Sequence, residues 1–299
     1  MSQANPLQPI PAPVGTPPAG ASKKPRSAGQ ILLFLILFLG SFVMVIPFLW
    51  MLLTSFDWGA RLNIKFPPRL WPEIPSTRPY EAAFTNIPMM RYIFNSIVVS
   101  GGVILVSALS ALLSGYALSK IRFKGANIVL LLALSTMMIP FEMTMIPQYL
   151  LFSKMGLIDT YWAFYFPALN YAFGTFLAKA FIDQLPSTLR EAGVIDGAKE
   201  STVFWKIYFP LCTPIIATMI ILLFLGVWND MLWPLLALKS ADKYTIQIGL
   251  AMFTYNNGVN QLPAIIMAAT TVSLIPVVAV YLFLQRYIIE SIALTGIKQ

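Results

Sequence analysis

The 299-residue chain is strongly apolar: 58% of its residues are hydrophobic, 11% are charged, and its mean hydropathy is +0.73. This composition excludes an ordinary soluble globular protein and indicates a membrane protein with lipid around it. The formal net charge of +8 does not indicate a nucleic-acid partner, because the basic residues are scattered in short loops between apolar runs. The chain has no histidine and one cysteine, Cys212, so we expect no internal disulfide, no metal site and no histidine-based catalysis.

Residues 1–29 form the first segment, which is rich in proline and has almost no large hydrophobic side chains. Such a segment cannot bury enough surface to order itself, so we expect a disordered cytoplasmic tail. The apolar run that follows, from about residue 30 to 54, is too long for the core of a signal peptide. We therefore expect it to remain as a first membrane-spanning helix.

Apolar stretches long enough to cross a bilayer occur six times, which predicts an all-α integral membrane protein with six transmembrane helices. A chain that crosses six times has both ends on one side. About twelve of the 20 Lys and Arg residues fall on the side of the N-terminus, so both termini are expected in the cytoplasm. The spans run roughly over residues 30–54, 92–118, 127–151, 160–182, 208–237 and 263–287.

The external segment between the first two spans, about residues 56–90, is rich in Pro and Trp and is predicted to be an irregular cap at the membrane surface. It is either an aromatic anchor at the interface or a contact for a delivered ligand or a binding protein.

Prolines interrupt the later spans. Prolines can kink helices and so act as hinges in a protein that changes shape.

Polar residues inside the spans are few. Aromatic rings beside amides and a carboxylate can hold sugar hydroxyls, so the polar residues could line a substrate path. The alternative is that they join helices to one another. The path candidates are Trp228, Asn229, Asp230, Asn170 and Tyr171.

The segment 183–207 is a polar island between two apolar spans. Thr188 stands three residues before Glu191, as in a capping box, and Asp196-Gly197 predicts a break before Ser201 caps a second helix. The pattern predicts two short helices arranged as an L.

This segment resembles the EAA loop of ABC-importer permease subunits, and further stretches resemble the carbohydrate-uptake permeases of the maltose type. The further stretches begin at Tyr116, Trp228 and Leu284. The resemblance implies that residues 30–299 form an importer transmembrane domain whose loop couples to a separate ATPase. The coupling residues that it implies are Glu191, Ala192, Gly193, Asp196, Gly197, Ala198, Phe204, Ile207 and Pro210.

The chain departs from the family pattern at two positions. Gly193 replaces the usual second alanine, which should loosen the first short helix by about 1 kcal/mol. Arg190 stands where an acidic residue is frequent. The ending Thr295-Gly296-Ile297-Lys298 resembles a segment that contacts the ATPase in the maltose-type system, although a frayed terminus is the alternative.

Energy has to come from partner subunits, because the chain has no Gly-x-x-x-x-Gly-Lys-Ser/Thr motif. The chain is therefore expected to be no enzyme and to bind no cofactor itself, with ATP and Mg on the partner. The resemblance implies an inner-membrane sugar importer with a second permease subunit, two ATP-binding cassette subunits and an extracytoplasmic sugar-binding protein. The alternatives are an ion-coupled secondary transporter, an ABC importer for a non-sugar solute and a membrane enzyme.

Overall fold

A computed structural model describes residues 28–61, 69–121, 123–256 and 262–296. The described residues form helices, and their only strand-like pairing is one isolated bridge between Asp57 and Pro75. The chain divides into two compact units, residues 1–48 and 49–299. The first helix, α1 (Ala28–Ser55), begins in the first unit and ends in the second. The predicted tail, residues 1–29, lies almost wholly outside the described residues.

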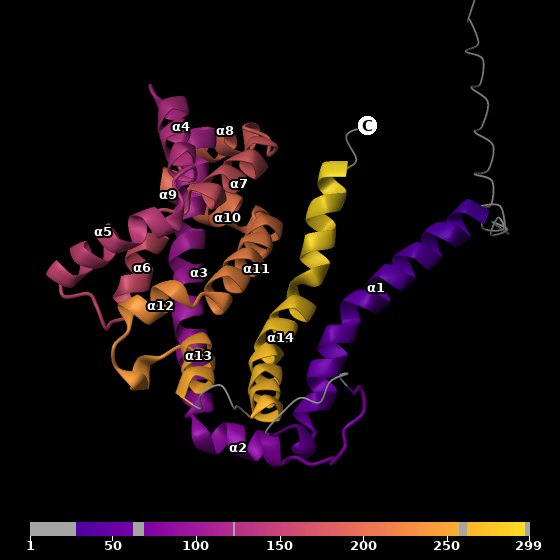
Figure 1. Cartoon of the computed structure of the whole chain (residues 1–299). Coiled ribbons are helices and arrows are strands. Elements are labelled where there is room, and N and C mark those ends of the chain that lie inside the picture. The colour runs from indigo at the N-terminus through magenta and orange to yellow at the C-terminus, as the bar shows by residue number, and fades with distance from the viewer. Residues whose placement is uncertain (1–27, 62–68, 122, 257–261, 297–299) are drawn as a thin grey trace, which may run out of the picture. The chain divides into compact units, whose positions relative to one another are not determined.

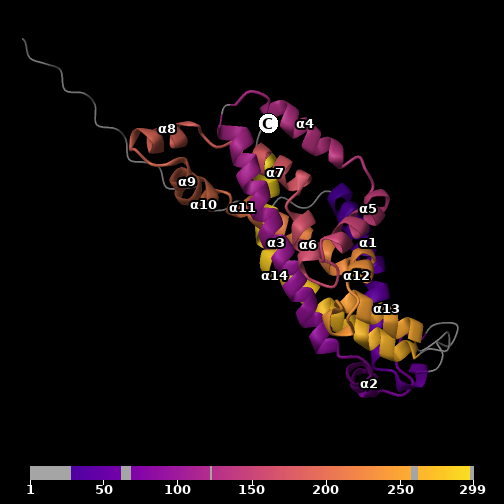
Figure 2. The same ribbon diagram turned by 90° about the vertical axis from the view of Figure 1, so that its left-hand side faces the viewer.

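The second unit is organised around the long helix α3 (Met89–Lys120). Figures 1 and 2 show α2 (Arg78–Asn86) and α13 (Ile246–Asn256) beside the beginning of α3, and α8 (Thr188–Ile195) near its end. The remaining elements surround this axis. They are η1 (Trp58–Arg61), α4 (Ala126–Thr136), α5 (Phe141–Lys154), α6 (Trp162–Ala168), α7 (Ala172–Asp183), α9 (Glu200–Val203), η2 (Phe204–Tyr208), α10 (Phe209–Leu211), α11 (Thr213–Asn229), α12 (Leu232–Ala237), η3 (Ala241–Lys243) and α14 (Pro263–Gly296).

Helices α3 and α7 approach each other closely because Gly115 lies at their crossing. A Cβ atom added to Gly115 would come 2.5 Å from the Ala178 Cβ and 2.8 Å from the Lys179 backbone nitrogen. The small side chains let the two backbones pack directly, as is common between membrane helices. On another side of α3, α11 packs between α3 and α14. The segments on both sides of the 183–207 loop, α7 and α11, therefore both lie against α3.

Three described helices are long and apolar enough to cross a membrane, and five spans result if each of two bent helix pairs counts as one. The three long helices, at Gly29–Ser55, Met89–Lys120 and Pro263–Arg286, confirm the predicted spans 30–54, 92–118 and 263–287. The bent pairs are α4 with α5, at 96°, and the segment Glu200–Leu211 with α11, at 74°. The total of six spans stays a prediction.

The predicted spans 127–151, 160–182 and 208–237 are not continuous helices: each contains a break, as the prolines within them allowed. Pro140 ends the turn before α5. Pro167 has no N–H to donate to the Ala163 carbonyl, which instead accepts a bond from Trp233 Nε1 at 3.1 Å. The helical conformation is interrupted at residues 169–171 and at residues 230–231.

The external segment is more regular than predicted. Residues 78–86 form the helix α2, with Pro79 in its first turn, where a proline costs no hydrogen bond. The Ser55 and Tyr80 hydroxyls, 2.7 Å apart, join the end of α1 to α2.

Candidate coupling loop and substrate path

Two short helices, α8 and α9, meet at a tight turn in the 183–207 loop, as the Asp-Gly pair predicts. Gly197 has φ +77°, the left-handed conformation that glycine adopts most readily, and this forms the predicted break. The Gly197 N–H donates to the Val194 carbonyl at 3.0 Å, and the Ala198 N–H donates to the Gly193 carbonyl at 2.9 Å. These two bonds form a Schellman motif, which sets the direction in which the chain leaves α8.

The predicted side-chain caps of the two helices are wrong. Helix α8 begins one residue earlier than expected: Ser187 is its N-cap position, has a helical backbone (φ −70°, ψ −21°) and makes no side-chain cap bond. A capping side chain needs an extended backbone, so Thr188, already inside the helix, cannot cap it. Helix α9 begins at Glu200 after the extended Lys199, so Ser201 is not its cap either.

Gly193 is the point at which the two arms of the loop touch. It is buried, and a Cβ atom there would lie 3.0 Å from Val203 Cγ2 and 3.4 Å from Ile207 Cδ1. The glycine that appeared to be a weakness in α8 therefore lets the second arm pack directly against the first. Helix propensity alone could not reveal this contact, because it depends on residues ten and more positions away.

Glu200 joins the two arms to α3. Its Oε1 accepts a bond from Arg190 Nε at 2.7 Å and its Oε2 one from Arg190 Nη2 at 3.1 Å. The same Oε1 accepts a 2.6 Å bond from the Tyr116 hydroxyl on α3. We call these three residues the Glu200 clamp. The ion pair also raises the pKa of the Arg190 guanidinium, so this side chain stays charged.

Further polar contacts fix the start of the loop to the last turn of α3. Lys120 Nζ donates to the Leu185 carbonyl at 2.7 Å, and the Ser119 hydroxyl donates to Asp183 Oδ1 at 2.6 Å. Lys179 Nζ lies 2.6 Å from Asp183 Oδ2. Burial opposes ionisation of Asp183, but the bonds from Lys179 and Ser119 outweigh it and lower the pKa of this carboxyl. The loop is thus held by a charged network at one end of α3.

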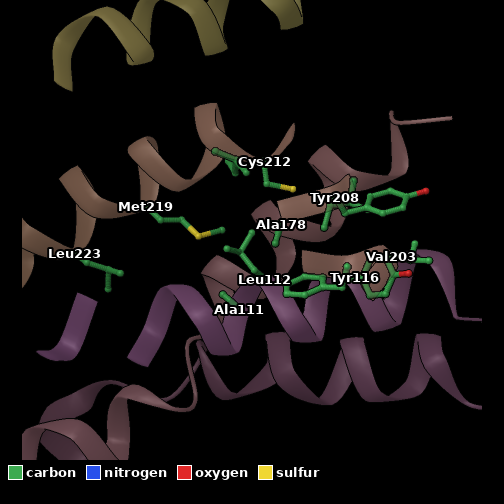
Figure 3. Packing of buried hydrophobic residues seen from close by; sticks show 12 residues of the cluster. Ala111, Leu112, Tyr116, Ala178, Val203, Tyr208, Cys212, Met219 and Leu223 are labelled. Atoms are coloured by element: carbon green, nitrogen blue, oxygen red, sulfur yellow. The ribbon is translucent and has the colours of Figure 1, made fainter. Parts of the chain in front are cut away.

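Beneath these bonds lies an apolar cluster, in which Tyr116 and Tyr208 pack with ring centres 5.0 Å apart. Figure 3 shows both hydroxyls directed toward the same end of the cluster. The Tyr208 hydroxyl donates to the Pro186 carbonyl at 3.3 Å. Cys212, which is fully buried, belongs to the same cluster.

The nine predicted coupling residues fall into three groups by exposure. Glu191, Ala192, Asp196, Gly197 and Pro210 are exposed, Ala198 and Ile207 are partly buried, and Gly193 and Phe204 are buried. The exposed surface of α8 also includes two apolar residues that the sequence did not single out: Ile195 is 84% exposed and Val194 47%. A hollow of about 260 Å³ beside Glu191 is lined by Ser119, Lys120, Ser187 and Arg190.

The five predicted path residues lie at two helix breaks. Trp228 is buried: it stacks on Phe224, and its Nε1 donates to the Ser273 carbonyl at 3.2 Å. Asn229, the last residue of α11, is exposed and donates from Nδ2 to the Leu225 carbonyl at 2.9 Å.

Asp230 follows as the first residue of the break and holds the start of α12. Its Oδ1 accepts bonds from the N–H groups of Leu232 and Trp233 at 3.0 and 3.4 Å. At the other break, Asn170 is exposed and Tyr171 is partly buried just before α7. Two of the five residues therefore present exposed amide groups.

At the C-terminal end, Thr295 and Gly296 are the last two residues of α14. The other two members of the predicted ATPase contact, Ile297 and Lys298, lie outside the described residues.

The fold is that of a transport permease. It matches the crystal structure of a bacterial ABC transporter for import of the acidic polysaccharide alginate with a TM-score of 0.77, covering 91% of this chain and 100% of that one at 23% identity. Residues 13–293 match the family described as binding-protein-dependent transport system inner membrane component, and the chain belongs to that family. It is thus a membrane component of an ABC importer and not itself an enzyme.

Curated relatives extend the similarity. An arabinooligosaccharides transport system permease protein of Halalkalibacterium halodurans is 38% identical over 204 residues, covering 68% of this chain and 72% of the relative. A lactose transport system permease protein of Rhizobium radiobacter is 27% identical over 89% of this chain and 95% of the relative. An sn-glycerol-3-phosphate transport system permease protein of Yersinia enterocolitica is 30% identical over 75% of this chain and 80% of the relative.

Proposed function

We propose that the outer surface of α8 docks onto a separate ATPase subunit and couples ATP hydrolysis to transport. The exposure of Ile195 carries this proposal, because a large apolar side chain that is 84% exposed on a polar loop gains from a protein partner that covers it. Glu191 and Asp196 flank it with negative charge, which suits a partner with basic residues. The hollow beside Glu191 offers room for a partner side chain.

The nine coupling residues take two roles in this proposal. The exposed residues Glu191, Ala192, Asp196, Gly197 and Pro210 touch the ATPase or lie at the edge of the contact. The less exposed residues Gly193, Ala198, Phe204 and Ile207 hold the two arms in the orientation that the contact needs. The C-terminal residues Thr295, Gly296, Ile297 and Lys298 provide a second contact with the ATPase subunits.

The working assembly that we propose has a second permease subunit, two ATP-binding cassette subunits that hold ATP and Mg, and an extracytoplasmic binding protein. Docking to an ATPase requires the α8 loop to face the cytoplasm, which agrees with the excess of Lys and Arg on that side and places both termini there. Residues 30–299 form the transmembrane domain, with residues 183–207 as its coupling loop.

The transported solute is proposed to be a sugar or oligosaccharide, since several relatives are named for such solutes: arabinooligosaccharides, lactose and diacetylchitobiose. A phosphorylated polyol is the second candidate, because the Yersinia relative is named for sn-glycerol-3-phosphate. We place the solute path at Asn229, Asp230, Asn170 and Tyr171, with Trp228 supporting Asn229 from within the bundle.

A pull-down with the partner ATPase tests the docking proposal. Glu191→Lys places a positive charge on the docking surface and should lower ATPase recovery about tenfold or more, while the variant still inserts and pairs with its sister permease. Glu81→Lys makes the same change at an exposed position of α2, at the other end of α3, and should leave recovery unchanged. Equal recovery with both variants would show that α8 is not the docking surface.

A further inference from the structure

We infer that the Glu200 clamp transmits movement of α8 to α3, which makes Glu200 and Tyr116 positioning residues for transport. This inference rests on the proposed docking of α8, and it adds the route by which a displacement at the docking surface reaches the bundle.

The route is not provided by chain connectivity. The loop is joined covalently to α7 at one end and, through η2 and α10, to α11 at the other. Helix α3 is distant in sequence: Tyr116 and Glu200 are 84 positions apart. Any movement of the loop therefore reaches α3 only through non-covalent contacts.

Among the described contacts between α3 and the loop, the clamp alone ties α3 to the docking helix through side-chain hydrogen bonds. Lys120 binds the Leu185 carbonyl, which lies before α8 begins. The Tyr116 hydroxyl instead binds Glu200, which holds Arg190 on α8. A displacement of α8 thus pulls on Arg190, then on Glu200, and then on Tyr116.

The chemistry of the clamp suits transmission because it fixes orientation. Two parallel bonds from a guanidinium to a carboxylate set both distance and direction, which a single bond cannot do. The carboxylate is also partly shielded, with 35% of its side chain exposed, and this strengthens its bonds. Helix α3 contacts α6, α7, α11 and α13, so a shift of its end changes its packing against these four helices.

The test is the amount of solute transported per ATP hydrolysed by the complete complex in proteoliposomes. Glu200→Gln retains the size of the side chain but loses its charge, and Tyr116→Phe removes one hydroxyl. Each should lower the ratio of transport to hydrolysis about threefold or more, with ATPase recovery unchanged. Tyr165→Phe is the matched control: it removes a hydroxyl bonded to the Val98 carbonyl at 3.2 Å outside the clamp, and the ratio should not change.

A charge exchange provides the second test. Arg190→Glu combined with Glu200→Arg rebuilds the ion pair, and Tyr116 can bond to either side chain, so the ratio should recover relative to Arg190→Glu alone. An unchanged ratio in both Glu200→Gln and Tyr116→Phe overturns the inference and leaves the docking proposal intact. Loss of ATPase recovery in those variants also overturns it, because the clamp would then shape the docking surface. If the docking proposal itself is wrong, a separate result shows it: Glu191→Lys then recovers the ATPase normally in the pull-down.

Discussion

Gly193 and Val203 stand on the two arms of the coupling loop so close together that a Cβ atom on Gly193 would come within 3.0 Å of the Val203 side chain. Val203 is fully buried and has little room to move. The direct contact between the arms keeps α8 and α9 in one arrangement, and it leads to the first prediction.

Gly193→Val should destabilise the loop by about 1–3 kcal/mol through overpacking. Gly193→Ala should be nearly neutral, because a gain of about 1 kcal/mol in helix propensity is offset by the crowding at Val203. Limited proteolysis of the purified complex measures the opening of the loop. Gly101→Ala in α3 is the control: no atom lies within 4 Å of its added Cβ, so it should only stabilise. Rescue of Gly193→Val by Val203→Ala is expected, and its absence would count against the packing explanation.

Gly197→Val should misdirect the second arm, because a β-branched residue is strained at φ +77°. We expect lower recovery of the ATPase subunit and weaker coupling of hydrolysis to uptake. Gly125→Val is a matched control, since Gly125 also has a positive φ, +93°, and open space around it, but stands before α4. If both variants reduced ATPase recovery equally, the effect would come from general strain and not from the direction of the loop.

Single cysteines at Ser76 and Ser201, in a Cys212→Ala background, should react with an impermeant maleimide from opposite sides of the membrane. Helix α3 separates the two positions: its 32 residues extend about 48 Å, against a hydrocarbon core of about 30 Å. Cys212 is fully buried, so its replacement removes no accessible thiol. Labelling of both positions in intact cells would contradict the proposed orientation.

Asn229→Ala should raise the half-saturation concentration for uptake about fivefold, as expected when a neutral hydrogen bond of about 1 kcal/mol to the solute is lost. Asp230→Asn keeps an oxygen for the N–H groups of Leu232 and Trp233, so any change reports the charge rather than loss of the cap. Asn127→Ala, at an exposed position in α4, is the control. Unchanged uptake kinetics in both test variants would assign Asn229 and Asp230 to helix packing.

Asp159 should stabilise the contact between the turn before α6 and the segment after α12 in a pH-dependent way. It joins the turn before α6 to the segment after α12 through Ser240, the Lys239 N–H and Lys243. Burial opposes its ionisation, but these bonds outweigh burial and lower the pKa of Asp159 well below its ordinary value of 3.8. The folded state therefore favours the carboxylate. The Asp159 carboxylate contributes its full stabilisation above about pH 4, and this stabilisation is lost as the carboxyl is protonated at lower pH.

Asp159→Asn should accordingly lower the midpoint of thermal unfolding of the purified protein at pH 7, with a difference from the wild type that shrinks as the pH falls below about 4. Asparagine is the right replacement because Asp159 has φ +63°, which Asn tolerates. A difference that stayed constant between pH 7 and pH 3 would refute a role for the charge.

Local signals in the sequence determined several features correctly. The long apolar runs predicted α1, α3 and α14, because a helix in lipid needs only to satisfy its own backbone. The Asp196-Gly197 pair predicted the turn of the coupling loop, because the left-handed conformation strongly favours glycine.

Tertiary contacts decided the rest. Near the break between α6 and α7, the Ala163 carbonyl that Pro167 leaves free accepts a bond from the Trp233 indole, 70 positions away. Gly193 permits close packing of the two arms only because Val203 lies against it. Glu200 joins the loop to α3 only because Arg190 and Tyr116 lie within hydrogen-bond distance. A hydrogen bond or a close contact between distant residues leaves no periodicity and no local propensity in the chain. Only the packing of α3 against the loop brings these groups within reach of one another.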